Sequence, residues 1–274
     1  MATPEAPLRE ILKSISFTQL PLRHIEPFFE PEPIAAPRLY IYDGGAQGKG
    51  ELPTHDVECL RVLALLRFAR YDFDIAHAAE PNGSPDGRLP YLLLPDGTAL
   101  ASGEIAAHLE REGCALPECT LAGELAYRTM VERNLAPAVE YMAWLDPAGF
   151  GAVGDARYLG GYPALVRRLL GWIRAGQVAA AVRAGMAERG TAIDGEILTE
   201  NALRALDSLL GLVGSSDFLA GCPSLLDAHA AACINALLEA PPSFPLRSAL
   251  TRPDSKYKPL VDYARRILDT HIAA

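Results

Sequence analysis

The chain has 274 residues, of which 50% are hydrophobic and 22% are charged, the composition of a folded protein with one or two hydrophobic cores. Its 34 acidic and 25 basic residues give a net charge of −9. This excludes a strongly basic nucleic-acid binder, because phosphate neutralisation needs concentrated lysine and arginine. The longest stretch without a charged residue, 228–238, is far shorter than the roughly 20 residues that a helix needs to cross a bilayer. We therefore expect no transmembrane helix.

The N-terminal residues and the cysteines indicate the compartment. Glu5 and Glu10 occur early and no apolar run follows them, which argues against a secretory signal or an arginine-rich transit peptide. An odd number of cysteines without a CxxC motif argues against a disulfide framework and favours a reducing compartment. Histidines and cysteines show no metal-ligand spacing, so neither a metal nor another cofactor is expected. The cysteines are Cys59, Cys114, Cys119, Cys222 and Cys233.

Residues 1–37 differ from the rest of the chain. Seven prolines exclude a long helix or a central strand in this segment. Between the prolines lie more bulky apolar residues than a disordered tail normally carries. We interpret the segment as a docking arm, which binds either its own domain or a partner. The apolar residues expected to dock are Leu8, Ile11, Leu12, Phe28 and Phe29.

From residue 38 the sequence alternates between short β-rich runs and helical patterns. Apolar residues recur at helical spacing between Val57 and Phe68, and the turn residues Pro95–Gly97 join two β-rich runs as a hairpin. The predicted order is β-α-β, a hairpin and a final helix, all within residues 38–113. The expected strands are 39–42, 73–76, 88–94 and 98–100, and the expected helices lie at 57–68 and from residue 105.

After residue 120 the strand signals end and only helical runs follow. A compact α/β unit followed by an all-helical unit, residues 120–274, is therefore the predicted architecture. The helical runs are 121–145, 162–187, 196–213, 224–240 and 257–272. Residues 149–154 match GxGxxG literally, but a helix rather than a strand precedes them, so we expect a flexible inter-helix loop and not a dinucleotide site.

Two motifs resemble glutathione-transferase-like proteins. A β-α-β-hairpin-α unit whose third strand begins with Leu89-Pro90 is similar to the thioredoxin-like fold, in which this proline is cis and exposes the neighbouring backbone to a peptide or thiol. Ser224 and Asp227 form a helix-capping box like that of the helical domain of these proteins, a structural feature. The resemblance implies a thioredoxin-like N-terminal domain followed by an all-helical glutathione-transferase-like C-terminal domain.

Within that superfamily the chain resembles the metaxins. The similarity lies in residues 55–60, which open the first helix, in residues 84–90 before the third strand, and in the late helix at 257–261. The proline-rich leader before residues 37–42 is similar to the smaller metaxin-type receptor subunit of the fungal mitochondrial sorting and assembly machinery.

The resemblance implies a non-catalytic receptor that is peripheral on the cytosolic face of the mitochondrial outer membrane. Its implied partners are the membrane-embedded β-barrel insertase, a second metaxin-like subunit and β-barrel precursor proteins, whose C-terminal β-signal it would recognise; nucleic acid is not among them. An extended peptide could bind beside the third strand, which makes Pro90, Tyr91 and Ser102 the candidate groove residues. The arm, with Phe28 and Phe29 as apolar anchors, would dock on the insertase.

Transferase chemistry lacks its expected residues. A glutathione transferase needs a hydroxyl or thiol near the start of the first helix, and usually an acidic residue followed by serine after the fourth strand. After the fourth strand this chain has Ala101-Ser102, without the acidic residue. Near the start of the first helix the candidates are Thr54, which is expected to cap the helix, and Cys59, which is expected to pack in the core. No catalytic residue is predicted. The alternatives are a divergent soluble glutathione transferase and a purely structural scaffold of the same complex.

Overall fold

The computed structural model describes residues 34–42, 52–78, 83–117, 119, 121–185, 193–214 and 216–273. Residues 34–274 form one compact unit. The apolar residues predicted to dock, Leu8, Ile11, Leu12, Phe28 and Phe29, lie outside the described residues, so their role stays a prediction.

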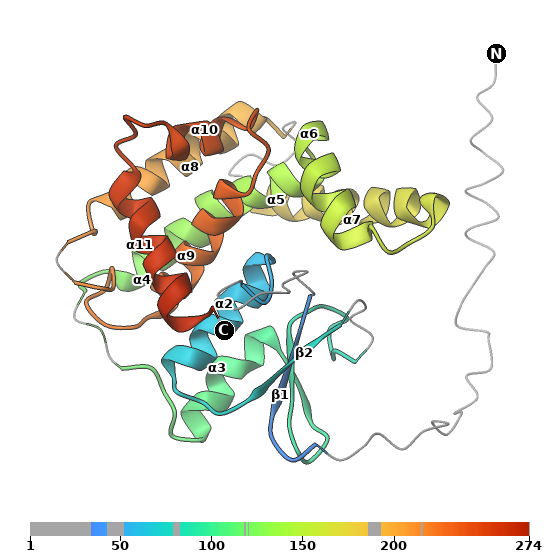
Figure 1. The fold of residues 1–274 in the computed structure, drawn as a ribbon, viewed down its shortest axis with the longest axis vertical. Coiled ribbons are helices and arrows are strands. Elements are labelled where there is room, and N and C mark those ends of the chain that lie inside the picture. Colours follow the sequence, from blue (N-terminus) through green and yellow to red (C-terminus); the bar gives the residue numbers. More distant parts are fainter. Residues whose placement is uncertain are drawn as a thin grey trace. The chain divides into compact units, whose positions relative to one another are not determined.

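A four-stranded sheet with the order β2-β1-β3-β4 forms the N-terminal part of this unit (Figure 1). β1 pairs in parallel with β2 and antiparallel with β3, and β3 pairs antiparallel with β4. Helices α2 and α3 cover one face of the sheet. This is the predicted thioredoxin-like arrangement, and all four predicted strands are confirmed. The elements are β1 (Arg38–Ile41), α2 (Val57–Phe68), β2 (Asp74–His77), β3 (Tyr91–Leu93), β4 (Ala99–Ala101) and α3 (Ser102–Arg111).

Helix α2 has apolar residues on most of its faces, because it is buried both against the sheet and against α9. Leu60, Leu63 and Leu66 are each 0% exposed, and so are Leu39 and Leu92 of the sheet. On its other side α2 packs against α9, and α9 is buried along almost its whole length. A helix that is hydrophobic on every face needs such a double cover.

The helical part begins with a continuous helix, formed by α4 and α5, that passes through a short π-helical segment, η2. Helix α9 lies at the centre of the helical part, where it contacts α4, α5, α10 and α11. All five predicted helical runs are confirmed, whereas residues 147–159 and 245–251 are helical without having been predicted. The elements are α4 (Glu124–Met130), η2 (Val131–Leu135), α5 (Ala136–Trp144), α6 (Pro147–Gly149), η3 (Phe150–Leu159), α7 (Ala164–Gly185), α8 (Gly195–Leu210), α9 (Leu225–Leu238), α10 (Pro245–Thr251) and α11 (Lys258–His271).

The GxGxxG segment is not a loop, and that prediction was wrong. Residues 149–154 lie within α6 and η3, which begin where the carboxylate of Asp146 accepts a hydrogen bond from the Gly149 N–H at 2.7 Å. A Cβ at Gly149 would overlap the carbonyl oxygen of Met142, and one at Gly154 would overlap that of Ala143. The glycines therefore permit the close approach of this segment to α5, which is a packing role.

The cysteines require a second correction, because the structure contains one disulfide bond. Cys119, in the linker after α3, is bonded to Cys222, just before α9, and the two are separated by 103 residues. Cys59 and Cys233 are free and buried, and Cys114 is free and half-buried. A pair so far apart in sequence is brought together by the fold of the helical part, which an odd cysteine count does not reveal.

No helix in the described part of the chain combines the length and the apolarity that a bilayer crossing demands.

Candidate functional site

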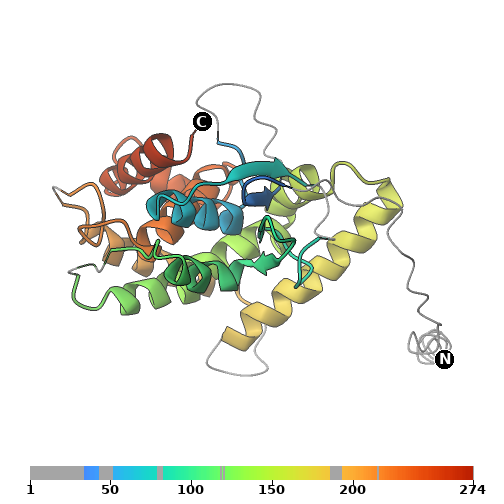
Figure 2. The ribbon, with the colours of Figure 1, turned by 90° about the horizontal axis from the view of Figure 1, so that it is seen from below.

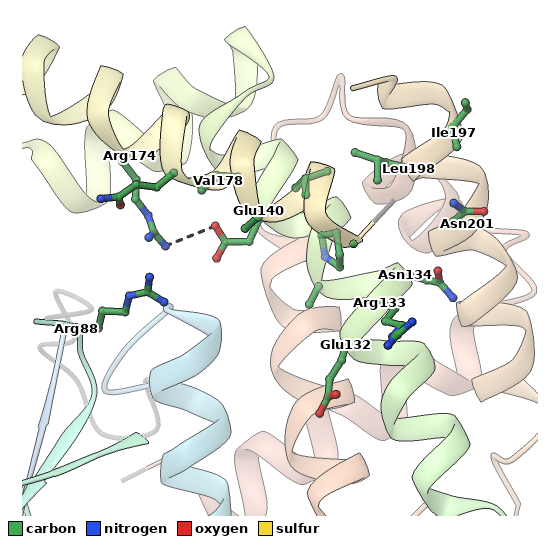
Figure 3. A pocket seen from close by; sticks show the side chains of 16 residues that line it. Arg88, Glu132, Arg133, Asn134, Glu140, Arg174, Val178, Ile197, Leu198 and Asn201 are labelled. Atoms are coloured by element: carbon green, nitrogen blue, oxygen red, sulfur yellow. Dashed lines mark ion pairs between the residues drawn. The ribbon is translucent and has the colours of Figure 1, made fainter. Parts of the chain in front are cut away.

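A cleft lies between the thioredoxin-like part and the helices α5, η3 and α7. One cavity, of about 650 Å³, is lined by the start of α2, residues 86–89, and side chains of these three helices. A second cavity, of about 760 Å³, extends along α5, α7 and α8 (Figure 3). The two cavities share Arg88, Glu140 and Arg174, so they adjoin, and together they are called the cleft below.

Aromatic side chains and one buried carboxylate form the inner wall of the cleft. The Tyr158 ring lies edge-on to Tyr42, with centroids 5.2 Å apart, and tilted against Trp144 at 5.3 Å. Asp56 accepts hydrogen bonds from the Tyr158 hydroxyl at 2.9 Å and from the Cys59 N–H at 2.8 Å. Burial raises the pKa of the Asp56 carboxyl, and these two hydrogen bonds oppose the shift. The wall can take apolar side chains, and its Tyr158 hydroxyl is held by Asp56.

The mouth of the cleft carries charged groups that face one another. Arg174 of α7 pairs with the Glu140 carboxylate of α5 at 3.6 Å, and the Arg88 guanidinium points toward them from the opposite side (Figure 3). Oε2 of Glu140 is buried and accepts no hydrogen bond within the described residues. Burial raises the pKa of Glu140, opposed by the charge of Arg174. The mouth therefore presents a carboxylate oxygen that faces Arg174 without a hydrogen bond, beside two cationic side chains. This set is suited to the N–H groups and the carboxylates of a peptide.

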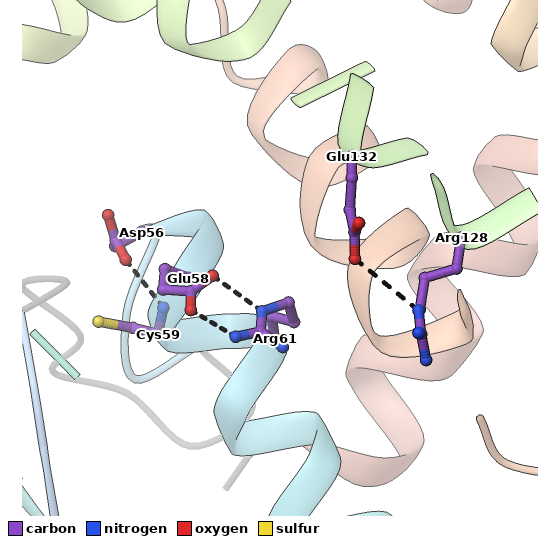
Figure 4. A network of polar contacts seen from close by, with 6 residues as sticks. All are labelled: Asp56, Glu58, Cys59, Arg61, Arg128 and Glu132. Carbon is purple, nitrogen blue, oxygen red and sulfur yellow. Dashed lines mark hydrogen bonds and ion pairs between the residues drawn. The ribbon is translucent and has the colours of Figure 1, made fainter. Parts of the chain in front are cut away.

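The position at which a glutathione transferase would hold the γ-glutamyl group is occupied by the chain itself. The Glu58 carboxylate pairs with Nε and Nη2 of Arg61, one turn later in α2 (Figure 4), and Ser102 lies close enough to lower the pKa of that carboxyl. Burial alone would raise the pKa of Glu58, but the Arg61 and Ser102 contacts hold it below its ordinary value. An ionised internal carboxylate at this place competes with an incoming one.

The predicted groove residues do not meet in the cleft. The Leu89–Pro90 peptide bond is cis, but Pro90, Tyr91 and Ser102 line neither of the two cavities. Tyr91 stacks on Tyr40, with centroids 4.7 Å apart, on the face of the sheet away from α2, and Ser102 begins α3. The preceding residues 88 and 89 line the cleft instead.

The start of α2 is capped differently from the prediction. Asp56, not Thr54, is the N-cap, and the Thr54 hydroxyl oxygen accepts a hydrogen bond from the Asp56 N–H at 3.2 Å. Cys59 is 0% exposed, and burial followed by the charge of Asp56 raises the pKa of its thiol well above the ordinary range. A buried neutral thiol fits the predicted packing role, since the thiolate is the reactive form.

Ser224 caps α9, but Asp227 does more than close a capping box. The Ser224 hydroxyl oxygen accepts a hydrogen bond from the Asp227 N–H at 3.2 Å, and the hydroxyl donates to the Asp227 carboxylate at 2.6 Å. That carboxylate accepts further hydrogen bonds from the Leu219 N–H at 2.7 Å and from the Tyr263 hydroxyl at 2.6 Å. Asp227 thus joins three segments of the helical part, a structural role.

Metal binding has no support within the described ranges. No group of three histidine, cysteine, aspartate or glutamate side chains there is arranged to hold an ion.

His229 of α9 makes the stability of the chain sensitive to mild acid. It lines the cleft, is 9% exposed, and burial together with the charge of Arg61 lowers its pKa from 6.5 to about 4. A depressed histidine pKa stabilises the fold fully above pH 6.5, and this stabilisation, about 3 kcal/mol, is lost as the pH falls toward 4. Urea unfolding of the wild type and of His229→Gln between pH 7.5 and 4.5 should show a shallower pH slope for the variant. Equal slopes would contradict the prediction.

Comparisons with known proteins agree with this geometry. The family model of the glutathione S-transferase N-terminal domain matches residues 57–149. Among solved structures, the β-etherase LigF from Sphingobium superposes with a TM-score of 0.52 at 17% identity, covering 85% of this chain and 95% of that one. A glutathione transferase of Phanerochaete chrysosporium also gives 0.52, at 13% identity, covering 87% and 98%. The chain thus has the glutathione-transferase-like fold.

Part of the chain is also similar in sequence to metaxin-1 proteins. The metaxin-1 homolog of Drosophila melanogaster is 32% identical over 124 residues, which cover 44% of this chain and 37% of the fly protein. Metaxin-1 of Mus musculus is 29% identical over 136 residues, covering 47% and 42%. The matched region spans less than half the length of these relatives. Over this region the chain is similar to metaxin-1.

Proposed function

We propose that the chain is a non-catalytic receptor subunit of the mitochondrial outer-membrane sorting and assembly machinery. In this role it is peripheral on the cytosolic face, docks on the β-barrel insertase and on a second metaxin-like subunit, and binds the β-signal of β-barrel precursors. Its similarity to metaxin-1 supports the assignment to this complex and to this membrane. The proline-rich leader supports the smaller of the two receptor subunits, with the arm directed to the insertase.

The cleft is the single feature that best supports peptide binding. It combines an aromatic wall at Trp144 and Tyr158 with a mouth at which Glu140 keeps a buried oxygen without a hydrogen bond. A peptide N–H would satisfy that oxygen, and Arg88 and Arg174 would hold a terminal carboxylate. Alternating apolar side chains of a precursor strand would then lie against the aromatic wall.

A divergent glutathione transferase remains the second candidate, favoured by the fold and by the matched transferase family model. Against it stand Ala101, at the position where a transferase usually carries an acidic residue, and the buried neutral Cys59. Retention on immobilised glutathione that is lost in Ser102→Ala would favour the transferase.

Site-specific photo-crosslinking in isolated mitochondria tests the receptor. A crosslinker at Gln177, which lines both cavities, should form an adduct with an arrested β-barrel precursor, and Arg88→Glu should weaken it severalfold by repelling the carboxylate. A crosslinker at the exposed Arg252, at the end of α10, is the matched control.

Two outcomes of this experiment contradict the proposal. No adduct from Gln177 while the chain still co-purifies with the insertase would identify a structural scaffold. Equal adducts from Gln177 and Arg252 would show that the cleft is not the binding site. In the same mitochondria, a chain lacking residues 1–30 should lose the insertase, and unchanged co-purification would refute the docking role of the arm.

A further inference from the structure

The large apolar side chains that are most exposed to solvent are concentrated on helix α7. Among the described residues, five of the seven such side chains belong to it, and Leu165 and Trp172 are 82% and 76% exposed. Scattered single apolar residues are normal on a protein surface, but a contiguous group marks an interaction site. The five residues are Leu165, Val166, Leu169, Trp172 and Ile173.

These side chains form a stripe along the solvent-facing side of the helix, and Ile173, at the edge of the stripe, also lines the cleft. Leu165, Leu169 and Trp172 follow the i, i+4, i+7 spacing that places residues on the same face. The opposite face buries Gly171, Val178 and Val182, and the helix packs against α5 and η3. α7 lies at the edge of the helical part (Figure 2), so its outer face is uncovered within the described unit. We call this face the α7 stripe.

The charge of α7 is the reverse of the charge of the chain. The helix carries four arginines and no acidic residue, whereas the whole chain has a net charge of −9. Arg167 is paired with Asp155 at 2.7 Å and Arg174 with Glu140 at 3.6 Å. Arg168 lies on the exposed side between the apolar residues of the stripe, and it makes no ion pair within the described part of the chain.

We propose that the α7 stripe lies in the headgroup region of an anionic phospholipid bilayer. Tryptophan and leucine on one face with arginine beside them suit the membrane interface, because the ring and alkyl groups enter the acyl boundary while guanidinium groups meet phosphates. The unpaired Arg168 within the stripe gives the charge complementarity. A second copy of this acidic chain offers less of it. The inference rests on the membrane location of the proposed function and is independent of precursor binding.

The two tryptophans of the chain allow a direct measurement. Trp144 is 8% exposed, so in a Trp144→Phe background the emission comes from the exposed Trp172 alone. The full chain is titrated with phosphatidylcholine vesicles that contain either no anionic lipid or about a third phosphatidylserine, an anionic fraction large enough to give a negative surface potential. We expect a blue shift of Trp172 emission and co-sedimentation with the anionic vesicles, both reduced by salt.

Matched variants distinguish vesicle binding through the α7 stripe from nonspecific binding by other exposed residues. Leu165→Ser with Leu169→Ser should lower the partition coefficient at least about tenfold, because each leucine contributes buried apolar area. Arg168→Glu should abolish the preference for anionic vesicles. The controls are Leu125→Ser, which changes an exposed leucine on α4, and Arg252→Glu, and both should bind as the wild type does.

Three results would overturn the inference. One is the absence of any binding to anionic vesicles by the wild type. Another is an equal loss in the control variants. The third is a wild-type dimer in size-exclusion chromatography that the stripe variants abolish while vesicle binding is unchanged, which would make the stripe a contact between copies. Precursor crosslinking at Gln177 is measured separately, so a failure here leaves the receptor proposal to its own test.

Discussion

Replacing Asp227 with alanine is expected to lower the free energy of unfolding by about 3–5 kcal/mol, the range for breaking a buried charged network. The carboxylate is 0% exposed and accepts hydrogen bonds from the Leu219 N–H and from the hydroxyls of Ser224 and Tyr263. Alanine leaves all three donors buried without an acceptor. Urea unfolding followed by circular dichroism at pH 7 measures the loss.

Graded variants test whether the network carries this effect. Tyr263→Phe removes a single hydrogen bond and should cost about 1–2 kcal/mol. Asp227→Asn keeps one acceptor oxygen, so its cost should fall between those of Tyr263→Phe and Asp227→Ala. An alanine variant that loses no more stability than Tyr263→Phe would show that the carboxylate is not the centre of the network.

Two glycines of one motif should respond oppositely to the same substitution. Gly149→Ala is expected to destabilise the chain by about 3 kcal/mol, because the new methyl group would overlap the Met142 carbonyl oxygen. Gly151→Ala, two residues later, places its methyl group in open space within the same helical segment. That variant should gain about 0.5–1 kcal/mol from helix propensity and from a less flexible unfolded chain.

Thermal unfolding of the two variants side by side decides between packing and flexibility. A flexible loop at residues 149–154 would tolerate both substitutions equally. Equal and small effects would therefore contradict the packing role of Gly149.

Local sequence patterns predicted most of the helices and strands correctly. The prediction failed where the local composition indicates a loop but tertiary packing favours a helix. The alternation in β1 and the helical spacing in α2 are encoded within a few residues, so the sequence was sufficient for both. Residues 147–159 contain one proline and three glycines, which locally predict a loop. They are helical because close packing on α5 favours the helix there and requires small residues.

Most residues of the candidate site could not be predicted from the sequence. Arg88, Glu140 and Arg174 come from three separate segments, and only the docking of α5 and α7 beside the thioredoxin-like part brings them together. The resemblance directed attention to Pro90 and Tyr91, beside the strand, whereas the cleft begins at the residues before them. No spacing rule connects side chains that meet only through tertiary structure.

The burial of α2 between the sheet and α9 has a consequence for modularity. Leu60, Leu63 and Leu66 lie in one core that continues into the buried face of α9. Cutting the chain between α3 and α4 would expose both helices to water, so neither half retains a complete interior. Residues 34–274 should therefore unfold in a single cooperative transition. The thioredoxin-like part cannot be combined with another helical part unless the surface of that part is complementary to α2.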